Sequence, residues 1–314
     1  MQPATSQTNR QKLFFCFFMD CQTPRKPGGG ADQTWDIAEK AVVGLAELFA
    51  DRGLSHALGF CSEPEVAIRQ SSLFRQTAAA GCWQALHFQV RGYRPKAAAE
   101  DYDWQRPLSD YGYEEQKSVI AIAKDEWEQA LGMAAEDFGA CCAQANDYTF
   151  PILAELGFKQ SYCSAPGRYD PGSGHLWWGA FPHSHHASSR SRLVCGDLDL
   201  YEFTLTRTLE PEPGPNPGTF RVRDLRAENE LGFDDAMQMA RASVIDMMLR
   251  DHPILYVHAP THNTWDVGDS SSPRRRAVQT VIDVAYALAQ EQGLELTPAS
   301  MKDMHEQADR LGAY

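Results

Sequence analysis

Apolar runs and amphipathic segments alternate along the first 165 residues of the chain. Apolar runs of strand length cover residues 13–20, 56–61, 83–90, 137–144 and 158–163. The segments between them, 34–53, 63–81, 113–132 and 149–157, have the composition and spacing of helices. Strands that regularly alternate with helices form parallel sheets joined by right-handed crossovers. The pattern therefore predicts a (β/α) barrel or a doubly wound sheet.

Residues typical of helix ends border the first two predicted helices. Thr34 precedes the first helix, where its side chain can cap the N-terminus, and Gly53 follows the last apolar position. Pro64 opens the second helix and Gly81 closes it.

The alternation lapses between residues 164 and 220. Residues 164–192 are rich in aromatic side chains and histidine, and residues 193–206 alternate like an exposed strand before a proline-rich excursion. Loops of this length usually carry function or lack a fixed structure. A helix over 234–251, a strand over 254–260 and a helix over 274–293 then resume the pattern. We therefore expect one barrel over 13–314 with a loop inserted around 164–220, preceded by a flexible N-terminus over 1–12.

Charge and cysteine content narrow the classes of partner. The chain has 314 residues and a net charge of -13, which disfavours nucleic acid and anionic membrane surfaces as partners. The opening apolar run is shorter than a membrane span and no small-residue cleavage site follows it, so we expect no export signal. The 8 cysteines form no Cys-x-x-Cys pair. We therefore expect a protein of the reducing cytoplasm.

Polar side chains stand where the predicted strands end. The first strand ends at Asp20, the third at His87, and the late strand at His258. The carboxyl ends of parallel strands share one face of the fold, so one carboxylate and two imidazoles are expected to converge there. Such a set can hold a divalent metal whose bound water becomes a nucleophile near neutral pH.

Several short motifs resemble those of the polysaccharide deacetylase (NodB-homology) superfamily. "FMDCQ" resembles the first-strand motif Thr-Phe-Asp-Asp, "HFQVR" resembles His-Ser/Thr-x-x-His, and "LYVH" resembles Leu-x-His. "TFPILAELGFKQ" resembles a helix and strand of the family, whereas "CCAQAND" replaces its Arg-x-Pro-Tyr/Phe motif. The resemblance covers residues 13–165 and the "ILYVH" strand. It implies an α/β fold, a distorted (β/α) barrel of about seven parallel strands in a single domain.

The resemblance also implies roles for individual residues. Asp20 is expected to act as general base or metal ligand, His87 as metal ligand, and His258 as the general acid that protonates the leaving amine. Arg91 stands where the family has its second metal-binding histidine. A guanidinium stays protonated and cannot coordinate a cation.

A metal centre would therefore need another ligand. We expect it from the loop "FPHSHHAS", with His183 as the first choice and His185 and His186 as alternatives. Cys21 is a further candidate, because a thiolate binds zinc well. The expected cofactor is a divalent metal, Zn²⁺.

Substrate-binding residues are expected around the same face. Arg91 can clamp a carboxylate or phosphate with two parallel hydrogen bonds. Tyr93 and Trp178 can stack on sugar rings.

Two functions from different classes remain open. The first is a hydrolase that removes an acyl group, such as acetyl, from an amide nitrogen of an amino sugar or related small molecule. The second is a catalytically inactive, metal-free barrel that acts as a carbohydrate-binding module, which the arginine at position 91 favours. Metal content and acetate release from N-acetylated sugars distinguish them.

Overall fold

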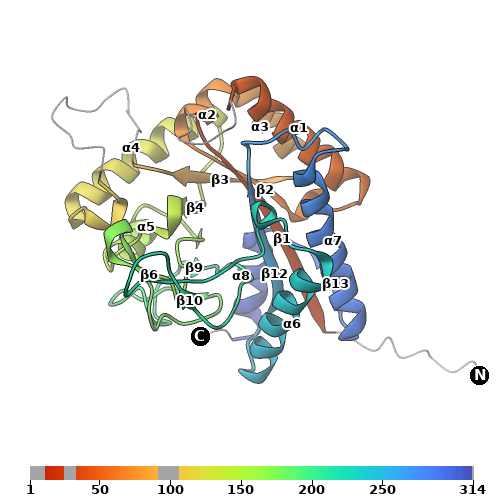
Figure 1. Cartoon of the computed structure of the whole chain (residues 1–314). Helices are drawn as coiled ribbons and strands as arrows, with labels where there is room; N and C mark the ends of the chain where they lie inside the picture. Colours follow the sequence, from red (N-terminus) through yellow and green to blue (C-terminus); the bar gives the residue numbers. More distant parts are fainter. Residues whose placement is uncertain (1–10, 25–32, 91–105, 313–314) are drawn as a thin grey trace, which may run out of the picture.

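A computed structural model describes residues 11–24, 33–90 and 106–312, and all structural statements below refer to these residues. Its main sheet has the strand order β12-β1-β2-β3-β4-β5-β9-β8, with β13 also paired to β1 (Figure 1). The strands of this sheet are β1 (Lys12–Cys21), β2 (Leu58–Ser62), β3 (Trp83–Phe88), β4 (Asp137–Ala140), β5 (Gln160–Ser161), β8 (His185–His186), β9 (Tyr201–Glu202), β12 (Leu255–His262) and β13 (Glu295–Pro298). From β12 to β9 every neighbouring pair is parallel, and β8 is antiparallel to β9.

The two ends of this parallel series approach each other. The backbone N–H of Thr206, just after β9, donates to the carbonyl oxygen of His258 in β12 at 2.8 Å. The backbone N–H of His258 in turn donates to the Thr206 hydroxyl at 3.0 Å. The sheet is therefore curled into a distorted barrel, which confirms the predicted fold class.

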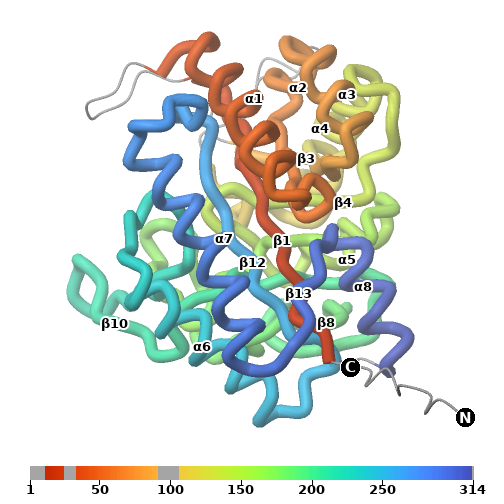
Figure 2. Tube along the Cα trace, turned by 90° about the vertical axis from the view of Figure 1, so that its right-hand side faces the viewer, coloured from red at the N-terminus to blue at the C-terminus, as the bar shows by residue number. Residues whose placement is uncertain are grey.

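Helices cover the outside of the curled sheet (Figures 1 and 2). They are α1 (Trp35–Asp51), α2 (Pro64–Arg69), α3 (Ser71–Ala79), α4 (Tyr113–Leu131), α5 (Thr149–Glu155), α6 (Phe233–Leu249), α7 (Pro273–Glu291) and α8 (Met301–Arg310). Thr34 caps α1 as predicted, because its hydroxyl accepts from the backbone N–H of Ile37 at 3.2 Å. The single helix predicted over 63–81 is instead two helices that meet at Gln70. No helix of the described chain is long and apolar enough to cross a bilayer.

Alternation along β1 decides which of its side chains point into the barrel. Phe15 and Phe17 point outward and pack on Phe49 of α1, with ring centroids 6.2 and 5.2 Å apart. Phe18 points inward, and its ring centroid lies 4.4 Å from that of Tyr162. Side chains two residues apart on a strand share a face. Asp20 therefore lies inside the barrel, at the carboxyl end of a strand that is apolar on both faces.

The segment that we expected as an inserted loop contains short strands. A second sheet has the order β10-β11-β6-β7, formed by β6 (Tyr169–Asp170), β7 (His175–Leu176), β10 (Glu212–Pro213) and β11 (Phe220–Arg221). Only β8 and β9 from this region join the main sheet. Strands of two residues are too short to produce a recognisable alternation in the sequence. Short 3-10 turns complete the fold at η1 (Ser55–Ala57), η2 (Leu108–Asp110), η3 (Cys141–Ala143), η4 (Pro171–Ser173) and η5 (Ala227–Asn229).

Candidate active site

A cavity of about 240 Å³ lies at the carboxyl ends of the barrel strands. Its ionisable and polar lining includes Asp20 from β1, His87 from β3, Tyr162 after β5 and His262 from β12. Segments outside the barrel strands add further lining residues, among them Arg168. The carboxyl ends of the strands are where (β/α) barrels place their active sites. We therefore take this cavity as the candidate active site.

The Asp20 carboxylate is held by two side chains, one from β3 and one from the residue that follows β5. Its Oδ1 accepts a hydrogen bond from the Tyr162 hydroxyl at 2.9 Å and lies 3.0 Å from His87 Nδ1. The Tyr162 hydroxyl also lies 3.2 Å from His87 Nδ1, so the three groups form one network. Only 13% of the Asp20 side chain is exposed. The network fixes the orientation of the carboxylate towards the cavity.

A glycine in β4 makes room for this network. Gly139 is paired in register with His87 on β3. A Cβ atom at position 139 would lie 1.8 Å from Cζ of Tyr162. No two non-bonded carbon atoms can approach so closely, so the Tyr162 ring can reach Asp20 only because residue 139 has no side chain.

A second imidazole faces Asp20 from β12. His262 is paired in register with Asp20, and its Nε2 lies 3.9 Å from Asp20 Oδ2. On its other side, Nδ1 lies 3.4 Å from Glu228 Oε1. Glu228 is anchored because the same oxygen accepts hydrogen bonds from the Thr261 hydroxyl at 2.8 Å and from the backbone N–H of His262 at 2.9 Å. His262 thus lies between two carboxylates.

The pKa shifts of these groups follow from their neighbours. Burial opposes ionisation of Asp20, but the charge and hydrogen bond of His87, helped by His262 and Tyr162, lower the pKa of Asp20 below its usual value. Burial also opposes protonation of His262, yet contact with Glu228 and the charge of Asp20 raise the pKa of His262. Burial likewise works against charge on Glu228, but its partners bring the pKa of Glu228 to about 2. The site therefore favours carboxylates beside an imidazolium.

His258 lies deeper in the barrel than we expected from the motif. It is paired in register with Cys16, and its ring packs between Phe18 and Phe203 at centroid distances of 5.1 and 6.0 Å. Burial lowers the pKa of His258 to about 4, so the ring is neutral at neutral pH. It precedes His262 by four strand residues, or about 13 Å along the strand. The structure therefore brings His262, rather than His258, beside Asp20.

The other predicted site residues lie away from Asp20 or outside the described residues. His183 Nε2 lies 2.7 Å from Asp246 Oδ2 of α6, and His183 is not part of the cavity lining. Trp178 packs on Phe220 with centroids 4.6 Å apart and likewise does not line the cavity. Cys21 is a buried thiol whose pKa burial raises well above its usual value. Arg91 and Tyr93 lie outside the described residues.

The turn after β4 contributes a thiol that the sequence reasoning missed. Cys142 and Ala143 have φ angles of 57° and 55°, in the left-handed region that non-glycine residues rarely adopt. Cys142 is exposed and lines the cavity, with its Sγ 3.3 Å from Sγ of buried Cys141. Contact with the Cys141 thiol, together with the positive charge of Arg168, lowers the pKa of Cys142, although burial opposes this shift. Cys142 is therefore more easily ionised than an ordinary thiol and is accessible from the cavity.

Arg168 is the cation that the cavity leaves available. Its guanidinium makes no hydrogen bond or ion pair within the described part of the chain, although burial lowers the pKa of Arg168. Arg226, the other arginine in the lining, is paired with Asp224, its Nη2 donating to Asp224 Oδ2 at 2.5 Å. An unpaired guanidinium in a cavity can bind an anionic group of a ligand.

The described residues do not assemble a three-ligand metal centre in this cavity. Asp20 Oδ1 and His87 Nδ1 contact each other and Tyr162, and His262 does not bring a third ligand atom within 4.8 Å of both. The described residues of this cavity therefore do not fit a three-ligand metal centre. In the described part of the chain, three potential metal ligands do come together at His186, His305 and Asp309, outside the cavity.

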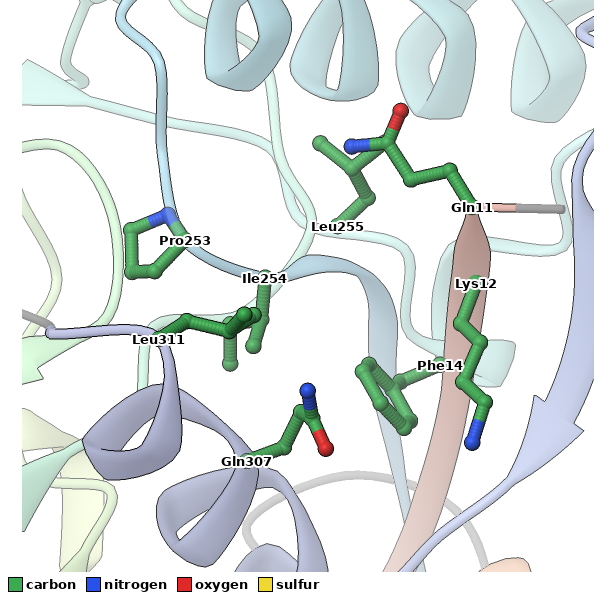
Figure 3. Close-up of a pocket in the computed structure, with 8 residues that line it drawn as sticks. All are labelled: Gln11, Lys12, Phe14, Pro253, Ile254, Leu255, Gln307 and Leu311. Atoms are coloured by element: carbon green, nitrogen blue, oxygen red, sulfur yellow. The ribbon is translucent and has the colours of Figure 1, made fainter. Parts of the chain in front are cut away.

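A second cavity is found at the opposite end of the barrel (Figure 3). It has a volume of about 440 Å³ and lies at the amino ends of β1 and β12. Lys12 is its one ionisable lining residue, beside apolar side chains such as Phe14, Ile254 and Leu311. Without a carboxylate, imidazole or thiol in its lining, this cavity lacks the groups for acid–base chemistry.

Fold and cavity together define a distorted (β/α) barrel with a candidate active site at the carboxyl ends of its strands. The sequence matches no model of a known protein family, and no curated protein matches it in sequence. Solved structures do match. They include a predicted polysaccharide deacetylase from Mycobacterium smegmatis, with 16% identity, a TM-score of 0.52, and coverage of 99% of this chain and 94% of the other.

Two further structures extend this similarity. A predicted glycoside hydrolase or deacetylase from Parabacteroides distasonis has 10% identity and a TM-score of 0.64 over 96% of this chain and 72% of the other. Puue allantoinase has 12% identity and a TM-score of 0.54 over 100% of this chain and 96% of the other. The resemblance to the polysaccharide deacetylases is thus confirmed at the level of the fold.

Proposed function

We propose that the protein is a hydrolase that cleaves the carbon–nitrogen bond of an N-acyl amide in a small molecule. The observation that carries this proposal is the position of the Asp20 carboxylate opposite His262, whose pKa is raised, in a cavity at the carboxyl ends of the strands. The fold shared with polysaccharide deacetylases supports the same reaction class by analogy.

In the proposed reaction, Asp20 and His262 divide the proton transfers. The Asp20 carboxylate accepts a proton from a water molecule, whose oxygen attacks the carbonyl carbon of the amide. As the carbon–nitrogen bond breaks, the His262 imidazolium donates its proton to the departing nitrogen. The products are a carboxylic acid and an amine. His87 and Tyr162 act as positioning residues, because they hold Asp20 Oδ1.

Arg168 supplies positive charge to the same cavity. As water attacks, negative charge develops on the carbonyl oxygen, and a fixed cation stabilises it in a site that excludes bulk water. We propose this role for Arg168. Replacing Arg168 with Met is then expected to lower kcat, whereas an arginine that only binds an anionic part of the substrate would chiefly change KM.

The size of the cavity bears on the substrate. Ligand pockets usually measure about 300–1,000 Å³, so a cavity of about 240 Å³ suits a small substrate or one end of a larger one. We therefore propose an N-acylated amino sugar or a related small amide, in preference to an internal unit of a polysaccharide.

The second candidate is a carbohydrate-binding module without catalytic activity. It is favoured by Arg91 at the position of the family's second histidine and by the lack of a three-ligand cluster among the described cavity residues. Release of acetate and of free amine from a panel of N-acetylated sugars and other small amides separates the candidates. Turnover that His262→Gln abolishes supports the hydrolase. Binding of the panel without turnover supports the module.

We also propose that the protein works in a reducing compartment such as the cytoplasm. All eight cysteines are free, and six of them are buried. In an oxidising compartment the thiols of Cys141 and Cys142 would be open to oxidation, because they are neighbours in an accessible cavity.

A further inference from the structure

We propose that His186, His305 and Asp309 form a zinc site that joins α8 to β8 and is separate from the active-site cavity. One potential ligand atom from each of the three residues lies within 4.8 Å of the other two. None of the three lines the cavity around Asp20. The site is expected to stabilise the fold, and it does not depend on the proposed hydrolase function.

The ligand atoms are close to the spacing that zinc requires. His186 Nε2 lies 2.8 Å from Asp309 Oδ1, and His305 Nε2 lies 3.5 Å from Asp309 Oδ2. Tetrahedral zinc with bonds of about 2.0–2.1 Å places its ligand atoms about 3.4 Å apart. Small rotations of the side chains are therefore enough to admit the ion.

Secondary structure places all three ligands on facing surfaces. His305 and Asp309 are four residues apart on α8, so they lie on one face of the helix. His186 belongs to β8 at the end of the main sheet, and Figure 2 shows β8 near α8. Figure 3 shows Gln307 of α8 turned towards the cavity at the amino ends of β1 and β12. His305 and Asp309 are each two positions from Gln307, and side chains two positions apart on a helix differ by about 200° in direction. The His305 and Asp309 side chains therefore point away from that cavity.

Hydrogen bonds outside the cluster leave the Nε2 atom of His186 suited to a metal. His186 Nδ1 lies 3.0 Å from the carbonyl oxygen of Leu198, which can only accept a hydrogen bond. Nδ1 must therefore carry a proton. In the neutral ring Nε2 then presents a lone pair towards Asp309. A carbonyl oxygen that fixes the tautomer in this way is the usual outer partner of a zinc-binding histidine.

Gln160 supports the same arrangement at His305. Its side-chain Nε2 lies 2.8 Å from His305 Nδ1, while its Oε1 is buried without a hydrogen-bond partner. The two ends of an amide are exchanged by a rotation of 180°. After that rotation, His305 Nδ1 donates to Oε1, and His305 Nε2 presents its lone pair to the cluster. In the described structure this Nε2 is buried and makes no hydrogen bond.

Neighbouring groups hold the two rings and leave a route for the ion. The Tyr201 ring lies 5.1 Å from the ring of His186 and 5.1 Å from that of His305, measured between centroids. The Asp309 side chain is 51% exposed, so water can reach the cluster and serve as a fourth ligand. Lone pairs of two neutral imidazoles that face a carboxylate repel one another. Either a proton or a metal ion must lie between them. A zinc ion can accept a lone pair from each imidazole and from the carboxylate at the same time.

The test is the zinc content of the full-length, tag-free protein after equilibration with zinc and removal of free metal. We expect about one tightly bound zinc ion per chain in the wild type, and loss of that ion in His186→Gln and in His305→Gln. Tm should rise on addition of zinc to the wild type and stay unchanged in both variants. Asp309→Asn provides a milder change at an exposed position, and circular dichroism shows whether each variant is folded.

Two control variants separate this site from other histidines. His183→Gln changes a buried histidine of the same loop, and His87→Gln changes the active-site cavity; both should keep the zinc ion. Zinc that persists in folded His186→Gln and His305→Gln, or a wild type that binds no zinc and shows no change in Tm, would overturn the proposal and leave a protonated imidazole–carboxylate cluster. Zinc lost from His87→Gln instead would place the ion in the active-site cavity. None of these results depends on catalytic turnover, so the hydrolase proposal can fail while the zinc site stands.

Discussion

Asp20 and His262 occupy paired positions on the neighbouring parallel strands β1 and β12, with Asp20 Oδ2 and His262 Nε2 3.9 Å apart. Each is also held from its far side, Asp20 by His87 and Tyr162, and His262 by Glu228. A carboxylate and an imidazolium are thus fixed on opposite sides of one space. Such a pair suits one proton acceptor and one proton donor in a hydrolysis.

Replacing His262 with Gln should reduce turnover by about 10²- to 10⁴-fold, the usual contribution of a general acid. Glutamine has a similar size, but its amide does not ionise near neutral pH and cannot donate a proton to the leaving nitrogen. The matched control is His258→Gln on the same strand, which is expected to affect stability more than the chemical step because that ring is buried between Phe18 and Phe203. Steady-state kinetics of the folded variants is the measurement. If His258→Gln abolishes turnover and His262→Gln does not, the assignment of the acid is reversed.

Gly139→Ala should disrupt the support of Asp20. The new Cβ would lie 1.8 Å from Tyr162 Cζ, so the ring must move and its hydrogen bond to Asp20 Oδ1 is lost. We expect destabilisation of about 1–3 kcal/mol from the overpacking, measured by urea unfolding.

Tyr162→Phe provides the comparison for that variant, because it removes the hydroxyl and leaves the packing of the ring. If the hydrogen bond to Asp20 is what turnover needs, both variants should lose activity, but only Gly139→Ala should carry the steric cost. Full activity in Tyr162→Phe would show that Asp20 needs no hydrogen bond from that residue.

The activity should depend on pH with two limbs. The proposed active form has Asp20 ionised and His262 protonated. Because the pKa of Asp20 is lowered from 3.8, the acid limb should fall below that value. Because the pKa of His262 is raised from 6.5, activity should persist above pH 6.5 and be lost as pH rises through the shifted value. The profile of kcat/KM for the free enzyme reports both groups.

Glu228→Gln tests the cause of the alkaline limb. Contact with Glu228 is the main influence that raises the pKa of His262, so its removal should move the alkaline limb to lower pH. The acid limb should change little, because no contact between Glu228 and Asp20 contributes to the shift of Asp20. If the alkaline limb does not move in Glu228→Gln, a group other than His262 is responsible for it.

Cys142 should be the first thiol to react with iodoacetamide in the folded protein. It is exposed, and its pKa is lowered, whereas burial raises the pKa of the half-buried Cys195 to about 11. Alkylation should block turnover, because Cys142 lines the cavity. Mass spectrometry identifies the modified residue.

Two variants complete the alkylation experiment. Cys142→Ser should be resistant to inactivation, and Cys195→Ser, the control, should be inactivated like the wild type. A saturating substrate or product should slow the modification if the cavity is the binding site. If iodoacetamide inactivates Cys142→Ser as rapidly as the wild type, alkylation of a different cysteine causes the loss of activity.

Local patterns in the sequence were sufficient for the barrel and for part of the site. Alternation of apolar runs with helical segments predicted the parallel strands and most helices. A strand buried on both faces is a continuous apolar run, and a helix buried on one face has apolar residues three and four positions apart. The polar residues at the ends of apolar runs identified Asp20 and His87, and the motif resemblance assigned roles to both. These two residues do lie together, since the strands β1 and β3 end on the same face of the sheet.

Tertiary structure decided the remaining partners. His262 was missed because the predicted strand ended at position 260, whereas the pairing of β12 with β1 carries the strand on to position 262. Tyr162, Glu228 and the glycine at 139 contact the site through pairings between segments distant in sequence, which no local periodicity encodes. The sequence by itself determined which residues form the buried strands and that Asp20 ends the first of them. Strand register and packing, which depend on contacts across the whole barrel, determined which imidazole faces it.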